Sequence, residues 1–510
     1  MFQLSRRCRV QSKGFDNEKY LAAQTAFILE RIDRIGGRLY LEFGGKLVHD
    51  FHAARVLPGY DPDVKMRLLE RLADGAEILL CIYAGDIERR RIRGDFGITY
   101  DTDALRLIDE LRGHGLVVRG VVVTRFDDQP SATGFINRLE RRSVQVFIHR
   151  ATRGYPTDVE LIASEQGYGM NPMIPCGKPL VIVTGPGPGS GKLGTCLSQL
   201  YHEHRHGVEA GFAKFETFPV WNLPLEHPVN AAYEAATADL GDFNLIDPFH
   251  LEADGTIAIN YNRDVEAFPV LRKLLERITG AASLYRSPTE MGVNRIADGI
   301  TDDDSVRTAA KDEIIRRYFR SKCEYATGIA EAESVRRIEG LMSRYDIEPE
   351  HRAVVPPARE TARLRAEETS AEATGAALEL PDGSVVTGHD SALMHAPAAL
   401  VINAVKRLAG LPKDLHLLAP GTIASIANLK LMVTGASACS LGLEEMLIAL
   451  SVSATTNPVA EFAMRELHRL RGCEAHLSHI PAPSDGAGLR KLGINFTSDP
   501  LFASGNLAAD

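Results

Sequence analysis

The sequence has no apolar run long enough to cross a membrane, and it is poor in cysteine. Seven cysteines are scattered through 510 residues without a Cys-x-x-Cys pair, which is typical of reduced thiols in a cytosol. The basic residues 1–14 are not followed by an apolar segment, so no secretory signal is predicted. These absences predict a cytoplasmic protein with no membrane partner.

The sequence also lacks an excess of basic residues. Its formal net charge is −9, from 58 Lys and Arg against 67 Asp and Glu, which argues against a nucleic-acid partner. Short basic runs at 89–91, 141–142 and 316–317 are interpreted as solvated helix faces. With 45% apolar and 25% charged residues, the composition is that of a globular protein, and its length predicts roughly two to four domains.

What the sequence does contain is an alternation of apolar, β-branched runs with helical patterns. The alternation predicts an α/β fold with a Rossmann-like, mostly parallel sheet, which binds ligands at the carboxyl ends of its strands. The first helix is expected over 17–35, where Asp16 or Asn17 can cap it. Strands are expected at 38–43, 77–83, 116–124, 144–148, 179–184, 210–218, 243–247 and 256–261.

Shifts in this pattern predict the domain organisation. Residues 1–175 are expected to form a Rossmann-like α/β domain, 176–300 a P-loop-like α/β region and 301–355 a helical segment. Residues 356–377, rich in Ala, Glu, Arg and Thr, are expected to be a linker or an exposed helix. A smaller α/β domain is expected over 378–510, with helices at 391–409, 442–455 and 458–471 and strands at 415–418, 474–480 and 494–497.

The most informative segment is a glycine-rich loop after the apolar run 180–183. It contains Ser190 and four glycines and ends in Lys192. Glycines let backbone N–H groups approach an anion, and a following helix and a lysine add positive charge. The loop therefore predicts a site for ATP, another nucleotide or a phosphorylated metabolite, and the alternative is a structural Gly/Pro turn. The four glycines are Gly185, Gly187, Gly189 and Gly191.

The loop departs from the G-x-x-x-x-G-K-[ST] pattern at two positions. Pro186 stands where the pattern has glycine, and Leu193 stands where it has the Ser or Thr whose hydroxyl binds Mg²⁺. Thr195 lies roughly 200° around the helix and cannot substitute for it. The sequence thus favours phosphate binding over ATP hydrolysis in the usual P-loop manner.

Charged residues downstream of the loop are candidates for the rest of a phosphate site. Lys192, Glu216 and Asp247 are the candidate catalytic residues, and Asp239 and Asp247 the candidate Mg²⁺ ligands, because phosphate chemistry with Mg²⁺ needs carboxylates. Lys214 and Arg263 are candidate phosphate clamps. The alternatives are that Asp247 caps a turn or helix and that Arg263 forms a surface salt bridge.

Two other segments stand out. His202 to His206 matches H-E-x-x-H, which on a helix can bind zinc. His206 is expected in the last helical turn and no third ligand follows, so zinc is not expected. The Pro-rich segment 215–230 contains the only tryptophan, Trp221, and is expected to be an ordered loop that lines a pocket or packs between domains.

Several blocks together resemble a bacterial family of about this length that is catalogued as a domain of unknown function. The similarity covers residues 15–500 and implies a cytosolic, multi-domain α/β protein. It supplies no catalytic residues to carry over, and some members bear the label ATP-dependent peptidase. The blocks are 41–47, 50–60, 185–192, 214–225, 235–239, 246–250 and 260–264.

The patterns favour an α/β enzyme of the phosphoryl-transfer or ligase type that binds a small phosphorylated ligand. One alternative is a non-catalytic protein that binds a phosphorylated metabolite or regulates other proteins, and it is favoured by Leu193. A second alternative is a metal-dependent, ATP-dependent peptidase. A chain of this size with crevices between domains is also expected to form a homo-oligomer.

Overall fold

The computed structural model describes residues 13–93, 97–370, 372–434 and 439–503. These residues divide into two compact units. The larger unit consists of Lys13–Glu234 and Asp242–Ala310, and the smaller one of Ala235–Gly241 and the described part of Lys311–Asp510.

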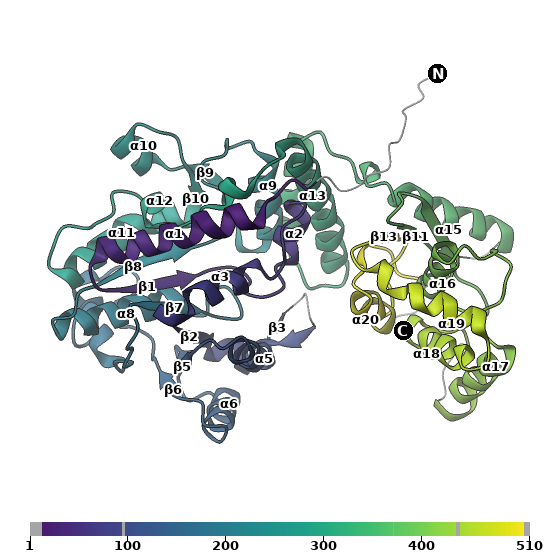
Figure 1. Cartoon of the computed structure of the whole chain (residues 1–510), viewed down its shortest axis with the longest axis horizontal. Coiled ribbons are helices and arrows are strands. Elements are labelled where there is room, and N and C mark those ends of the chain that lie inside the picture. The colour runs from purple at the N-terminus through teal and green to yellow at the C-terminus, as the bar shows by residue number, and fades with distance from the viewer. Residues whose placement is uncertain (1–12, 94–96, 371, 435–438, 504–510) are drawn as a thin grey trace. The chain divides into compact units, whose positions relative to one another are not determined.

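The larger unit is built on a six-stranded sheet with the order β6-β5-β2-β7-β1-β8 (Figure 1). All five neighbouring pairs are parallel, so the carboxyl ends of all six strands lie at one edge. The α/β class and the parallel sheet are therefore confirmed. The strands are β1 (Arg38–Phe43), β2 (Ala76–Tyr83), β5 (Val118–Thr124), β6 (Val146–Ile148), β7 (Leu180–Thr184) and β8 (Ala210–Phe215).

Helices cover both faces of this sheet. Val181 and Val183 of β7 pack with α8 (Lys192–Arg205) and α11 (Asn262–Thr279) on one face, and α1 (Asn17–Ile35) lies along the other. The Asp16 side chain accepts hydrogen bonds from two amides of the first turn of α1, and Gly36 ends the helix with φ +70°. This helix is confirmed with the predicted bounds, because its start and stop signals are local.

Shorter elements complete the larger unit. Two small antiparallel sheets pair β9 (Asn244–Ile246) with β10 (Ile259–Tyr261) and β3 (Ile92–Arg93) with β4 (Ile98–Thr99). The remaining helices that begin in this unit are α2 (Phe51–Val56), α3 (Val64–Leu72), α4 (Ala84–Glu88), α5 (Tyr100–Gly113), α6 (Pro130–Glu140), α7 (Val159–Ile162), α9 (Pro228–Ala236), α10 (Pro248–Asp254), α12 (Pro288–Met291) and α13 (Asp303–Ala326).

The smaller unit contains a mixed sheet of order β12-β11-β13-β14, with only β13 and β14 paired in parallel. Ala377 faces α15, and its neighbours Ala376 and Leu378 face the other helices. The strands are β11 (Gly375–Glu379), β12 (Val385–His389), β13 (Glu474–Leu477) and β14 (Asn495–Ser498). The helices are α14 (Ala332–Arg344), α15 (Val355–Thr369), α16 (Ala396–Leu408), α17 (Pro420–Leu429), α18 (Leu443–Ala454), α19 (Pro458–Arg465) and α20 (Pro483–Lys491).

Three strand assignments in this unit differ from the sequence-based expectation. The strand predicted at 415–418 is wrong, because Leu417 and Leu418 are buried among helices outside any strand. β11 and β12 were not predicted. Close helix packing selects small residues along β11 and at Gly388 of β12. A Cβ at Gly375 would lie 2.5 Å from the carbonyl oxygen of Ala358, and one at Gly388 would lie 2.3 Å from the amide nitrogen of Leu400.

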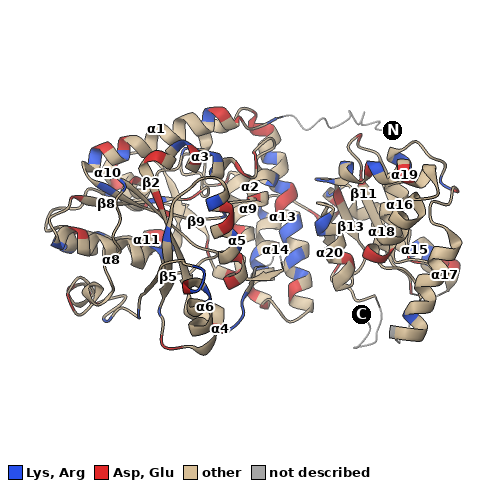
Figure 2. Cartoon of the chain, turned by 60° about the horizontal axis from the view of Figure 1, so that its bottom comes forward, with Lys and Arg blue, Asp and Glu red and all other residues tan. Residues whose placement is uncertain are grey.

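The charged residues of α13 differ from the sequence-based interpretation at positions 316–317. Figure 2 shows Lys and Arg next to Asp and Glu along α13 and α14. The interpretation of 316–317 as a solvated face is wrong, because both arginine side chains are only 13% exposed and bind the buried Glu313. Among the described residues, no helix is long and apolar enough to cross a membrane.

Candidate functional site

The glycine-rich loop connects β7, a central strand, to α8 at the carboxyl edge of the large sheet (Figure 1). Gly191 is the N-cap residue of α8, with φ +91°, and no side chain caps this helix end. The amides of the first helical turn therefore carry the partial positive charge of a helix N-terminus without a side-chain acceptor.

Three of the four glycines are required by close packing. A Cβ at Gly185 would lie 2.3 Å from the carbonyl oxygen of Cys81, one at Gly187 would lie 2.5 Å from the Tyr100 ring, and one at Gly191 would lie 2.7 Å from Thr124. Gly189 has open space around it, and its φ of +70° is what favours glycine there. The loop is thus a tightly fitted backbone turn.

Two cations lie at this loop. The Nζ of Lys192 is 3.5 Å from both the Gly187 carbonyl oxygen and the Oγ of the buried Ser190. Arg125 donates a hydrogen bond to the Gly189 carbonyl oxygen, and its guanidinium lies 3.5 Å from the centre of the Tyr83 ring. Sequence reasoning missed Arg125, although it directly follows a predicted strand, and only the strand order places it beside the loop.

The first turn of α8 has no hydroxyl directed at the loop. Leu193 follows Lys192, and the hydroxyl of Thr195 is buried under the sheet, where the Cys81 thiol donates to it at 3.4 Å. Burial raises the pKa of the neighbouring Cys196 thiol well above its ordinary value. This thiol is therefore a packing residue and not a reactive one.

A second group of charged residues lies where β8 ends. The Nζ of Lys214 is 2.5 Å from Oδ2 of Asp264 and 3.1 Å from Oε1 of Glu216. Burial raises the pKa of Glu216 to about 7, against the opposing effect of Lys214 and with a further contribution from Asp264. Although burial favours the neutral amine, Asp264 and Glu216 keep the pKa of Lys214 above its ordinary value. A carboxyl group with a pKa near 7 can both donate and accept a proton at neutral pH.

Glu42 connects these two groups of residues. It lies on β1 and pairs in register with Val183 of β7 and with Lys214 of β8. Its carboxylate raises the pKa of Cys196 in α8 and also that of Glu216. The glycine-rich loop after β7 and the Lys214 group at the end of β8 therefore lie at one sheet edge, separated by β1 with Glu42.

Arg263 belongs to the same unit as this arrangement, and Asp239 belongs to the other unit. Arg263 is 49% exposed and its Nη1 is 3.3 Å from Oδ2 of Asp242, but its charge also lowers the pKa of Glu216. Asp239 is exposed in a short 3₁₀ turn that belongs to the smaller unit, whereas Lys192 belongs to the larger one.

Asp247 is a fully buried cap. It follows β9, which is not part of the six-stranded sheet. Its Oδ1 accepts hydrogen bonds from the amides of Phe249 and His250, and its Oδ2 accepts from the hydroxyl of Thr289 at 2.6 Å and from the Thr289 amide at 3.2 Å. The geometry around Asp247 is that of the capping alternative.

The H-E-x-x-H residues make local hydrogen bonds at the end of α8. A ring nitrogen of His202 lies 2.7 Å from the Asn171 carbonyl oxygen, and one of His206 lies 2.7 Å from the His202 carbonyl oxygen. The buried Glu203 binds Arg38 and accepts from the Tyr40 hydroxyl. In the part of the chain that the structure describes, no three His, Cys, Asp or Glu side chains are grouped to hold a metal ion.

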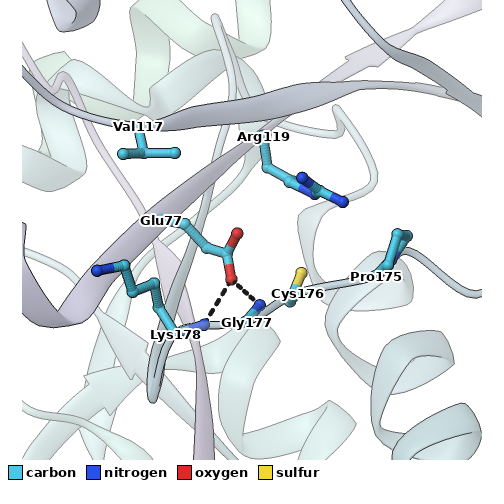
Figure 3. Close-up of a pocket in the computed structure, with 7 residues that line it drawn as sticks. All are labelled: Glu77, Val117, Arg119, Pro175, Cys176, Gly177 and Lys178. Carbon is cyan, nitrogen blue, oxygen red and sulfur yellow. Dashed lines mark hydrogen bonds between the residues drawn. The ribbon is translucent and has the colours of Figure 1, made fainter.

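A hollow of about 410 Å³ lies at the opposite edge of the large sheet (Figure 3). It is formed by the starts of β2 and β5 and the segment before β7. Glu77 points into it, and its Oε1 accepts hydrogen bonds from the amides of Gly177 and Lys178 at 2.5 and 2.8 Å. The Glu77 carboxylate thus stabilises the backbone segment that precedes β7.

The sequence matches two family models over nearly its whole length. Residues 13–346 match the N-terminal part of the domain of unknown function DUF1846, and residues 350–507 match its C-terminal part. The chain belongs to the DUF1846 family. Its DUF1846 N-terminal part contains the whole six-stranded sheet and the glycine-rich loop, so the resemblance seen in the sequence is confirmed.

Bacterial relatives of this DUF1846 chain are similar from end to end. A "UPF0371 protein" of Clostridium botulinum strain Alaska E43 is 54% identical, and one of Clostridium tetani strain E88 is 53% identical. Both alignments span 496 residues, which is 97% of this chain and 99% of each relative. The similarity to these relatives therefore extends over both units of this chain.

Proposed function

We propose that the protein binds a nucleotide or another phosphorylated metabolite at the glycine-rich loop and acts as a phosphoryl-transfer or ligase-type enzyme. One observation carries the proposal: the N-terminus of α8 has no side-chain cap and faces the carboxyl edge of a parallel sheet, with Lys192 and Arg125 beside it. Backbone amides and two cations are the groups that hold phosphate in proteins.

In this proposal the loop amides and Lys192 hold the phosphate, and Arg125 neutralises its outer oxygens. Glu216 is the proton donor or acceptor, because its pKa is close to 7 and it directly follows β8 at the same sheet edge as the loop. Lys214 holds Glu216 in place and has its own charge balanced by Asp264. Catalysis then depends on positioning and charge neutralisation, with little covalent work by the protein.

For a Mg²⁺ ion that accompanies the ligand, Glu42 is the candidate carboxylate, because it lies on β1 between β7 and β8 and Glu216 is assigned to proton transfer. Asp247 supports the fold in this proposal, since both of its oxygens already accept hydrogen bonds. We also place the protein in the cytoplasm, because all six described cysteines are free thiols.

Calorimetric titration with ATP, ADP and inorganic phosphate, with and without Mg²⁺, tests the proposal. Lys192→Ala is expected to weaken binding by about tenfold or more, because it removes a charged partner of the phosphate. Lys178→Ala is the matched control, since this lysine lies at the opposite edge and its Nζ donates to the Asp74 carbonyl oxygen. Equal binding by wild type and Lys192→Ala, or no binding of any probe, would overturn the proposal.

Leu193 and the buried Thr195 specifically favour the second candidate function, a non-catalytic protein that binds the same class of ligand. The two candidates differ in turnover. A bound nucleotide recovered unchanged after incubation with a panel of acceptor substrates supports the non-catalytic protein, whereas release of a phosphorylated product that is lost in Glu216→Gln supports the enzyme.

A further inference from the structure

A pocket of about 200 Å³ lies in the larger unit, and none of its lining residues belongs to the glycine-rich loop. It is formed by the C-terminal half of α1, by Trp221 in the Pro-rich segment, by α10 and by α12. Gly292, which lines it, pairs with Lys214 of the edge strand β8. Trp221 belongs to the segment 215–230, for which the sequence left open whether it lines a pocket or packs between domains.

Arg31 is the unusual residue of this pocket. Its side chain is buried, at 6% exposure, and its Nη1 donates to the hydroxyl of Tyr285 at 3.1 Å. The guanidinium lies 5.3 Å from the centre of the Tyr285 ring and 5.7 Å from that of Phe27. Among the described residues, no carboxylate lies within ion-pair distance of Arg31. A buried cation without an anionic partner is costly, so this position favours an anion from outside the chain.

The other charged groups of the lining leave this imbalance in place. Arg34 lies one turn further along α1 and is exposed. Glu290 binds Arg286 through Oε1 at 2.6 Å, and Arg286 also binds Asp254 at 2.5 Å, so the carboxylate of Glu290 is held away from Arg31 by this network. Glu30 is exposed to solvent, where its charge is screened. Among the described residues, Arg31 is therefore the buried cation of this lining and has no carboxylate at ion-pair distance.

The walls of the pocket are aromatic and fixed in place. The indole Nε1 of Trp221 donates to the Asn294 carbonyl oxygen at 3.1 Å, and the His250 ring packs edge-on against the indole at 6.2 Å. Asp247 holds two lining residues, through the amide of His250 and the hydroxyl of Thr289. Because these groups are already ordered, binding a ligand here would involve little loss of side-chain conformational entropy.

We propose that this pocket binds a small organic anion, with its acidic group on Arg31 and a flat apolar body against Phe27 and Trp221. A guanidinium presents two parallel N–H donors that match a carboxylate or a phosphate, and the aromatic walls match a planar ring. This assigns Asp247 a positioning role at the pocket. The inference does not depend on the glycine-rich loop.

The single tryptophan provides the test. Benzoate is expected to change Trp221 fluorescence saturably, with a Kd on the order of 1 mM, as is usual for so small a probe. Benzamide has the same ring and no charge, and it is expected to bind at least about tenfold more weakly because it cannot neutralise Arg31. Titrations at constant ionic strength with Lys192→Ala are expected to match wild type, which separates this pocket from the proposed phosphate site.

Two substitutions identify the cation. Arg31→Met removes the charge at similar length and is expected to abolish the benzoate response, with folding checked by its circular dichroism spectrum. Arg34 is exposed, so Arg34→Ala does not endanger folding. This variant is expected to weaken benzoate binding about threefold. The matched control is Arg277→Ala, an exposed arginine paired with Glu160. The proposal is overturned if benzoate gives no saturable response, or if benzamide binds as tightly as benzoate. It is also overturned if a folded Arg31→Met variant, or both arginine variants, bind benzoate like wild type.

Discussion

The Nζ of Lys214 lies 2.5 Å from Oδ2 of Asp264, and the same Nζ lies 3.1 Å from Glu216. Lys214 was predicted as a phosphate clamp, but its charge is shared between two carboxylates of its own chain. Its effect is therefore directed to Glu216, whose protonation it opposes. Glu216 consequently becomes the residue on which the chemistry of this sheet edge can be tested.

The first prediction concerns the pH dependence of stability. Burial raises the pKa of Glu216 from 4.5 to about 7 in the folded state. Between these values the folded chain holds a proton that the unfolded chain has lost, so this group lowers the free energy of unfolding as the pH rises from 4.5 to 7. The loss is at most about 3 kcal/mol. Urea unfolding at pH 5 and at pH 8 measures the free energy of unfolding at both values. In Glu216→Gln the decrease between them is expected to be smaller by the contribution of Glu216.

Glu252→Gln serves as the control for this experiment, because Glu252 is exposed on α10. It is expected to follow the wild-type profile. If the Glu216→Gln profile also runs parallel to wild type between pH 5 and pH 8, the raised pKa of Glu216 is wrong.

The second prediction compares two glycines at the start of α8. Gly191→Ala is expected to lower the free energy of unfolding by about 2 kcal/mol or more, because φ is +91° and the new Cβ would lie 2.7 Å from Thr124. Gly194→Ala is expected to raise stability by about 1 kcal/mol, because it lies inside the helix with no atom near its Cβ position. Urea unfolding of both variants measures the difference, and equal effects would contradict the loop geometry.

The third prediction separates the two roles considered for Asp247. Asp247→Ala is expected to lower the free energy of unfolding by about 2–4 kcal/mol, since it removes the cap of α10 and the acceptor for Thr289 from a buried site. Asp247→Asn keeps an oxygen for the cap and is expected to cost less than half as much. Thermal unfolding measures both losses.

A magnesium titration completes this test. If Asp247 acts only through the fold, Asp247→Asn leaves any Mg²⁺ dependence of nucleotide binding at the wild-type value. A selective loss of that dependence in a folded Asp247→Asn variant would instead make Asp247 a metal ligand.

The sequence by itself determined the features that depend on neighbouring residues. The Asp16 and Gly36 signals set both ends of α1, and the β-branched run before Gly185 set β7 and the loop that follows it. These features are predictable because capping bonds, strand propensity and glycine turns involve residues close in the chain. The same reasoning failed at β11, where close helix contacts favoured glycine and alanine over strand-forming residues.

Only the tertiary structure decided which of these features meet. β7 inserts between β2 and β1, which brings Arg125 to the Gly189 carbonyl oxygen and places Glu42 beside the loop. It also sets Arg31 and Trp221 in one pocket although 190 positions separate them. Strand order and helix packing are fixed by burial of apolar faces summed over the whole unit, and that sum cannot be evaluated from any local pattern.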